Sequence, residues 1–124
     1  MLQEAYGVST GVDARPALVF GGGIGHAGDV CGAVSGGAIA VGQMVGDHVA
    51  ELESAKVRAR QLALPFYRDF EREFGHVDCR SLIDLDISTD EGFQRFKQSN
   101  LKERLCSRLV SFAVQRLLPL REQV

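Results

Sequence analysis

The sequence has no tryptophan, no CxxC pair and no apolar run long enough to cross a membrane. The best candidate run, residues 30–45, is rich in glycine and about 16 residues long, whereas a spanning helix needs about 20. The net charge is −2 and no basic stripe is present, so we expect no nucleic-acid partner. The N-terminus lacks the basic and apolar regions of a signal peptide. These absences predict a soluble, cytoplasmic protein.

Cysteine is scarce, and its three copies are widely separated in the sequence. Cys31, Cys79 and Cys106 form an odd set with no short pairing motif. Such a set is more typical of a reducing compartment than of a secreted disulfide scaffold. The cysteines are therefore candidates for thiol chemistry or for ligands of a metal.

Charge and glycine are distributed unevenly along the chain. Residues 1–46 contain only four of the 30 charged side chains, and ten of the 14 glycines lie between Gly21 and Gly46. No stretch alternates between apolar and polar residues, and no hairpin dipeptide occurs, so strand signals are scarce. We expect one all-α domain over residues 1–124, a small helical bundle in which a glycine-rich loop leads into a buried central helix.

Helical periodicity and capping signals predict where the elements lie. The short segment Leu2 to Tyr6, followed by Gly7, is typical of the end of a longer helix. The further predicted helices are 13–20 opened by Asp13, 30–45 capped by Asp29, 49–74 kinked by Pro65 and ended by Gly75, 79–85 capped by Asp78, 88–98 opened by a Ser88–Glu91 capping box, and 101–118.

Two apolar faces of the predicted helices should form the core. The first lies on helix 30–45, and the second is a stripe at helical spacing on helix 49–74 that ends in three phenylalanines. We expect both faces to pack in the core, because phenylalanine is mostly buried. The two faces consist of Val30, Val34, Ala38, Val41 and Val45, and of Leu52, Ala55, Ala59, Leu62, Phe66, Phe70 and Phe74.

The positions of two cysteines suggest activated thiols. Cys31 and Cys79 fall at predicted helix starts, where unpaired N–H groups and the helix dipole lower the pKa of a thiol. Cys106 lies on an apolar face inside a helix. The functional hypothesis is that all three sulfurs converge as ligands of a metal ion or iron–sulfur cluster, or as exchanging thiols, with Cys31 and Cys79 as the reactive pair. The alternative is that they are buried fillers in a non-catalytic interaction or dimerisation module.

The glycine loop matches a nucleotide-binding pattern. Residues 23–28 fit GxGxxG, and Asp47 follows about 20 residues on, where a dinucleotide-binding fold places an acidic residue. No further alternation of strands and helices follows to build a parallel sheet, so nucleotide binding is the weaker alternative. The candidate cofactor-binding residues of this loop are Gly22, Gly23, Gly25 and His26.

Several motifs resemble the C_GCAxxG_C_C family of redox-active proteins. The resemblance covers nearly the whole chain from about Leu2, and its most specific part is the stretch VCGAVSG over residues 30–36. It implies an all-α domain with a thiol, metal or iron–sulfur redox role, and glycines that allow tight packing around Cys31. The resembling segments are residues 20–25, residues 30–36, residues 70–75 with Asp78, Cys79, Arg80 and Leu82, and Leu105 with Cys106.

One family feature is missing from the N-terminal residues. The family's front motif contains a cysteine followed by GCA, and residues 2–7 contain no cysteine. We expect either a translation start placed too late or a member without the front cysteines. Loss of the start of this first helix would leave an apolar groove, which a homodimer would fill. We also expect a redox partner protein.

Overall fold

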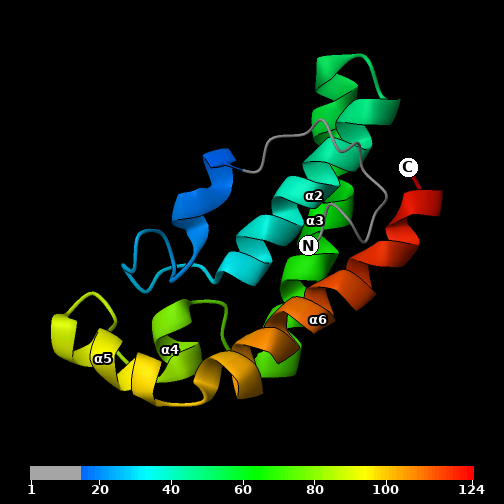
Figure 1. Ribbon diagram of the computed structural model, residues 1–124. Coiled ribbons are helices and arrows are strands. Elements are labelled where there is room, and N and C mark those ends of the chain that lie inside the picture. The colour runs from blue at the N-terminus through cyan, green and yellow to red at the C-terminus, as the bar shows by residue number, and fades with distance from the viewer. Residues whose placement is uncertain (1–14) are drawn as a thin grey trace.

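The computed structural model describes residues 15–124 and is helical, as the sequence predicts (Figure 1). Within that range no strand forms, apart from one isolated antiparallel bridge between Val30 and Asp78. Helices α2, α3 and α6 pack against one another, and α4 and α5 lie at the end of the bundle where α2 begins (Figure 1). The elements are η1 (Arg15–Phe20), α2 (Gly32–His48), α3 (Leu52–Phe74), α4 (Cys79–Ile83), α5 (Asp90–Gln98), η2 (Lys102–Cys106), α6 (Ser107–Leu117) and η3 (Leu118–Glu122).

The core lies between α2, α3 and α6. Phe66 and Phe70 of α3 are fully buried, and the Phe112 ring of α6 packs edge-on against Phe70 with a centroid distance of 5.9 Å. An ion pair joins the same two helices, because Arg116 donates from Nε to the Asp69 carboxylate at 2.7 Å. The predicted phenylalanine core is therefore confirmed, and the most buried side chains come from all three helices.

The central helix α2 begins two residues later than predicted. Cys31 occupies the N-cap position and Gly32 is the first helical residue. Asp29 is not the cap, since its carboxylate accepts only the neighbouring N–H of Val30, at 2.9 Å. The predicted cap was wrong because an aspartate just before an apolar run satisfies the capping pattern, although the chain here first continues extended into the bridge.

The buried face of α2 includes a glycine that the predicted face omitted. Ala38 is exposed, whereas Gly37 is buried. A Cβ at Gly37 would lie 2.6 Å from the Phe66 ring and 3.0 Å from Leu117. The missing side chain therefore lets α2 approach both neighbouring helices closely.

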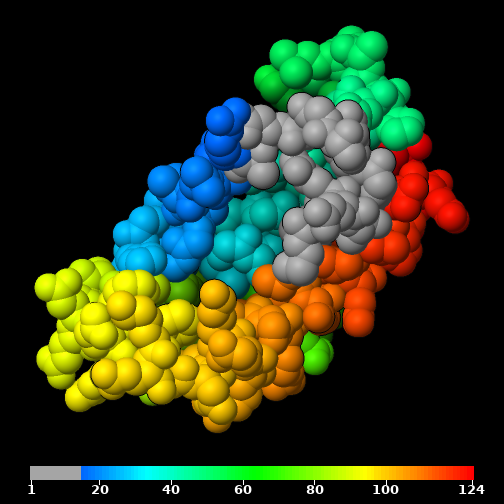
Figure 2. Space-filling view, in the orientation of Figure 1, coloured from blue at the N-terminus to red at the C-terminus, as the bar shows by residue number. Residues whose placement is uncertain are grey.

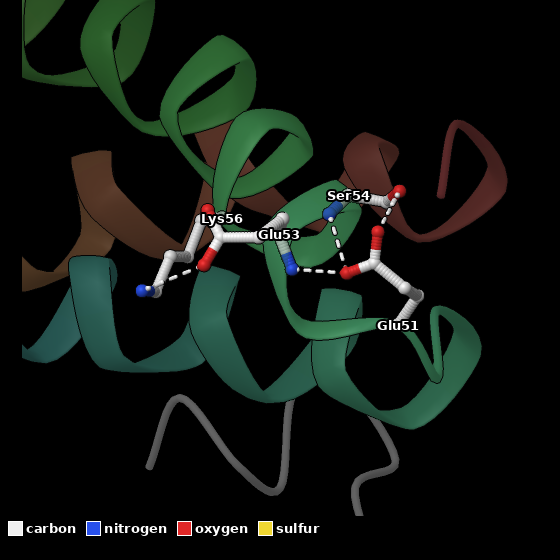
Figure 3. Close-up of polar contacts among 4 residues, drawn as sticks. All are labelled: Glu51, Glu53, Ser54 and Lys56. Carbon is white, nitrogen blue, oxygen red and sulfur yellow. Dashed lines mark hydrogen bonds and ion pairs between the residues drawn. The ribbon is translucent and has the colours of Figure 1, made fainter.

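Helix α3 is opened by a carboxylate cap. The Glu51 carboxylate accepts hydrogen bonds from the backbone N–H groups of Glu53 and Ser54 and from the Ser54 hydroxyl (Figure 3). The bond to the Glu53 N–H is the main reason that the pKa of Glu51 is lowered. Lys56 pairs with Glu53 at 3.2 Å in the same first turn.

The other end of α3 agrees with the prediction. Pro65 lies inside the helix, which runs on to Phe74. Gly75 then ends it in the left-handed region at φ 82°, the backbone conformation that favours glycine. At the start of the helix, Leu52 departs from the predicted core face, because it is 66% exposed.

The caps of the two short helices differ in how well the sequence predicts them. Asp78 caps α4 as predicted, accepting the N–H of Ser81 at 2.9 Å. The cap of α5 is Thr89 rather than Ser88, and its hydroxyl accepts the N–H of Gly92 at 3.0 Å. The Ser88 prediction was wrong although Glu91 completes its capping box in the sequence, because the Ser88 hydroxyl instead donates to the Asp86 carboxylate.

The N-terminal prediction is tested only in part. Residues 15–20 form a short 3₁₀ helix, in agreement with the later part of the predicted helix 13–20. Its proposed cap Asp13 and the predicted helix end at residues 2–7 lie outside the described residues.

Candidate cysteine site

The three cysteines line one cavity of about 340 Å³. It lies where η1 and the glycine loop meet the starts of α2, α4 and α6. No charged side chain occurs among the described residues that line it. Those residues are Ala17, Phe20, Gly21, Gly22, Cys31, Gly32, Ala33, Gly36, Cys79, Leu82, Ile83, Cys106, Leu109 and Val110. The three cysteines therefore line one largely apolar cavity, as a shared site would require, and their role there stays a prediction.

Backbone pairing brings Cys31 and Cys79 to the same wall. Val30 lies opposite Asp78 in the isolated bridge, and the N–H of Cys31 donates to the Val77 carbonyl at 2.7 Å. In this register Cys31 and Cys79 are diagonal neighbours, so their side chains point to the same face. Diagonal neighbours lie about 7–8 Å apart. The sequence contains no local signal for this pairing of two non-helical segments.

A wide helical turn carries Cys106. The segment Lys102–Cys106 is a π-helix that runs directly into α6. The predicted face on which Cys106 and Val110 lie together is retained, and both residues line the cavity. The prediction of a regular helix over 101–118 was wrong at this turn. Short π segments occur often at functional sites. The sequence pattern did not predict this one.

Burial keeps all three thiols protonated at neutral pH. Burial is the largest cause that raises the pKa of Cys31, and the N–H groups of Ala33 and Val34 oppose it in part. Burial also raises the pKa of Cys79 to about 11 and raises that of Cys106. The prediction of thiols activated by helix starts was therefore wrong, because desolvation outweighs the helix N-terminus.

The same pKa shifts show that the sulfurs influence one another. After burial, the charges of Cys31 and Cys106 are the next causes that raise the pKa of Cys79, and the charge of Cys31 likewise raises that of Cys106. Three thiolates around one cavity thus repel one another. A positively charged group between them would reverse this effect, since an opposite charge favours the ionised form.

The glycine loop turns the chain toward the cavity wall. Gly22, Gly23, Ile24, Gly25 and His26 all have φ between 59° and 71°, which is the left-handed region. A Cβ at Gly23 would lie 2.4 Å from the backbone N and O of Asp29, so only glycine fits there. The loop therefore uses its glycines to fold back onto the segment before α2.

The candidate cofactor residues of this loop separate in space. Gly22 lines the cavity, whereas Gly23, Gly25 and His26 are not among the described lining residues. The His26 ring is exposed and lies 4.7 Å from the Phe93 ring of α5. The segment before the loop is the 3₁₀ helix η1, so the strand that a GxGxxG nucleotide site requires does not precede it.

The cysteines surround the cavity rather than meet at a point. Within residues 15–124, no three histidine, cysteine, aspartate or glutamate side chains are grouped so that they could hold one metal ion. A single ion bonded to all three sulfurs would need such a grouping, because each Zn–S bond is only about 2.3 Å long.

The fold and the cavity define a small all-α protein whose candidate site is built from cysteine thiols. The chain belongs to the family described as "Putative redox-active protein (C_GCAxxG_C_C)", which matches residues 1–119, and the resemblance seen in the sequence is confirmed. No curated protein and no solved structure matches the chain. In the part of the chain that the structure describes, no helix has the length and apolar character to span a membrane.

Proposed function

We propose that Cys31, Cys79 and Cys106 hold an iron–sulfur cluster and that the protein transfers electrons to or from a redox partner protein. The observation that carries this proposal is the position of all three sulfurs on the wall of one apolar cavity of about 340 Å³. Cysteine thiolates are the usual ligands of such clusters, and apolar surroundings restrict the access of water.

The arrangement of the cysteines around the cavity supports a cluster rather than a single ion or a disulfide. A cluster spreads its ligands across a cavity, in keeping with the lack of any three-ligand grouping for one ion in residues 15–124. Cys31, Cys79 and Cys106 are all free thiols in the structure, and none of them is paired in a disulfide. Their raised pKa values also leave little thiolate for exchange.

When bound, such a cluster would supply one-electron transfer. The chain itself supplies three thiol ligands from separate elements, and the N–H groups of Ala33 and Val34 favour the ionised sulfur of Cys31. Four cysteines are usual for a cluster, so the fourth ligand in this proposal comes from beyond the described lining, from solvent or from another chain.

Anaerobic purification tests the proposal directly. We expect the wild-type protein, purified or reconstituted under nitrogen, to contain iron and acid-labile sulfide and to absorb visible light. Cys31→Ser, Cys79→Ser and Cys106→Ser should each lower the iron content. Ala38→Ser is the matched control, because it places the same side chain on an exposed position of α2.

The other hypotheses predict different results. Wild-type protein with neither iron nor sulfide after reconstitution would overturn the cluster. If a disulfide then forms and is reduced reversibly, thiol exchange is the function. If the serine variants change only the unfolding midpoint, the cysteines are core residues of an interaction module.

A further inference from the structure

Ser107 lies at the junction between the wide turn η2 and the regular helix α6. Its backbone N–H donates to the carbonyl of Lys102, five residues back, which is the hydrogen bond of a π-helix. In an α-helix the same N–H would bond to Glu103, four residues back. In the wide turn, the Glu103 carbonyl therefore does not accept the Ser107 N–H that it would accept in an α-helix.

The side chain of Ser107 replaces the missing donor. Its hydroxyl donates to the Glu103 carbonyl. Ser107 thus makes two hydrogen bonds to the wide turn, with the N–H bound to Lys102 and the hydroxyl bound to Glu103. An alanine at this position could make only the first bond. The Glu103 carbonyl would then lose the hydrogen bond from the hydroxyl.

The turn held in this way ends at Cys106, which is the last residue of the π-helix. In a helix, a side chain leans toward the N-terminus and packs on the residues three and four positions earlier. For Cys106 those residues are Glu103 and Lys102, which both belong to the wide turn. A π turn has more residues per turn than an α-helical turn, so it changes which part of the preceding turn the Cys106 side chain packs on. Cys106 lines the cavity together with Leu109 and Val110.

We propose that Ser107 is a positioning residue whose hydroxyl holds the wide turn and so keeps the Cys106 thiol open to the cavity. The importance of this role for electron transfer rests on the proposed cluster. The position of the thiol itself can be measured without any cluster.

The test measures the alkylation of Cys106 in reduced, metal-free protein. Iodoacetamide is applied at pH 8, and mass spectrometry of peptides gives the rate at Cys106 relative to Cys79 in the same molecule. Ser107→Ala should lower this ratio by roughly three- to tenfold, the range expected for the loss of one hydrogen bond. Ser107→Thr keeps the hydroxyl and should restore the wild-type ratio.

A second variant separates this effect from a general change in α6. Ser111→Ala makes the same substitution at an exposed position four residues later, and it should leave the ratio unchanged. Far-UV circular dichroism checks that each variant keeps its helices. The proposal is overturned by an unchanged ratio in Ser107→Ala, by an equal drop in Ser111→Ala, or by a failure of Ser107→Thr to restore it.

The outcome is independent of the cluster hypothesis. If the wild-type protein binds no iron and Ser107→Ala still lowers the alkylation ratio, the proposed function fails and the positioning role stands. If iron is bound and the ratio does not change, the positioning role fails alone.

Discussion

Cys31 donates its backbone N–H to the carbonyl of Val77 across 2.7 Å, and this bond joins the chain before α2 to the chain before α4. A second bond runs the other way, from the N–H of Cys79 to the Asp29 carbonyl at 2.7 Å. Two cysteines 48 positions apart are thereby placed on one wall of the cavity by backbone groups. Changes that disturb this pairing should therefore affect the site as a whole.

Gly23→Ala should destabilise the protein by at least about 2 kcal/mol, because left-handed backbone already costs about 1–2 kcal/mol for a residue with a Cβ. The new Cβ would also lie 2.4 Å from the backbone of Asp29, which cannot move aside like a flexible side chain. Urea unfolding measures the loss. Gly25→Ala is the control, since Gly25 has φ 59° but no atom within 4 Å of its Cβ position. Equal losses in both variants would show that the contact with Asp29 has no effect.

Gly37→Ala should cost about 1–3 kcal/mol, the usual range for overpacking a core. Its Cβ would lie 2.6 Å from the Phe66 ring, at the place where α2 meets α3. In the control Gly42→Ala, on the same helix, the Cβ would have no neighbour within 4 Å, and alanine there should stabilise by about 0.5–1 kcal/mol. Thermal unfolding of both variants checks the opposite signs. A stabilised Gly37→Ala would contradict the close approach of the helices.

The pKa of Cys79 predicts how the stability of the reduced, cluster-free protein depends on pH. Burial raises this pKa from 9.0 to about 11, so between these values the unfolded chain loses the proton and the folded chain keeps it. Stability is then complete below pH 9 and falls as the pH rises toward 11. Urea unfolding at pH 8 and pH 10.5 should show a larger loss for the wild type than for Cys79→Ser. Equal losses would argue that the thiol is not desolvated.

The homodimer expected from the sequence stays a prediction, and an exposed apolar pair offers a way to test it. Leu18 and Val19 of η1 are 76% and 59% exposed, and their element forms part of the cavity wall through Ala17 and Phe20. If this surface pairs two copies, Leu18→Glu should halve the mass measured by light scattering. Leu64→Glu changes a leucine that is 52% exposed on α3 and should leave the mass unchanged. A monomeric wild type would rule the dimer out.

Figure 2 shows that segments far apart in the sequence lie side by side on one face of the molecule. The segment from η1 and the glycine loop lies next to α5, and η2 follows along the same face (Figure 2). The contact between His26 and Phe93 is one link between the first two. No periodicity along the chain could predict such neighbours, because it reports only which residues share a face within one helix.

Features that depend on local chemistry could be predicted from the sequence. Helical spacing identified α3 and its phenylalanine core, Gly75 ended that helix, and Asp78 capped α4, since each effect acts within a few residues. The motif around Cys31 identified the family. Local signals failed at the start of α5, where Ser88 has the capping-box glutamate but Thr89 is the cap.

The placement of the three cysteines around one cavity depends on the tertiary structure. The pairing of Cys31 with Val77 depends on two segments that are far apart in the sequence and meet in space. The protonation of the thiols depends on burial, which outweighs the helix starts that the sequence displays. Desolvation is a property of everything that surrounds an atom, and it therefore appears only when the whole chain is folded.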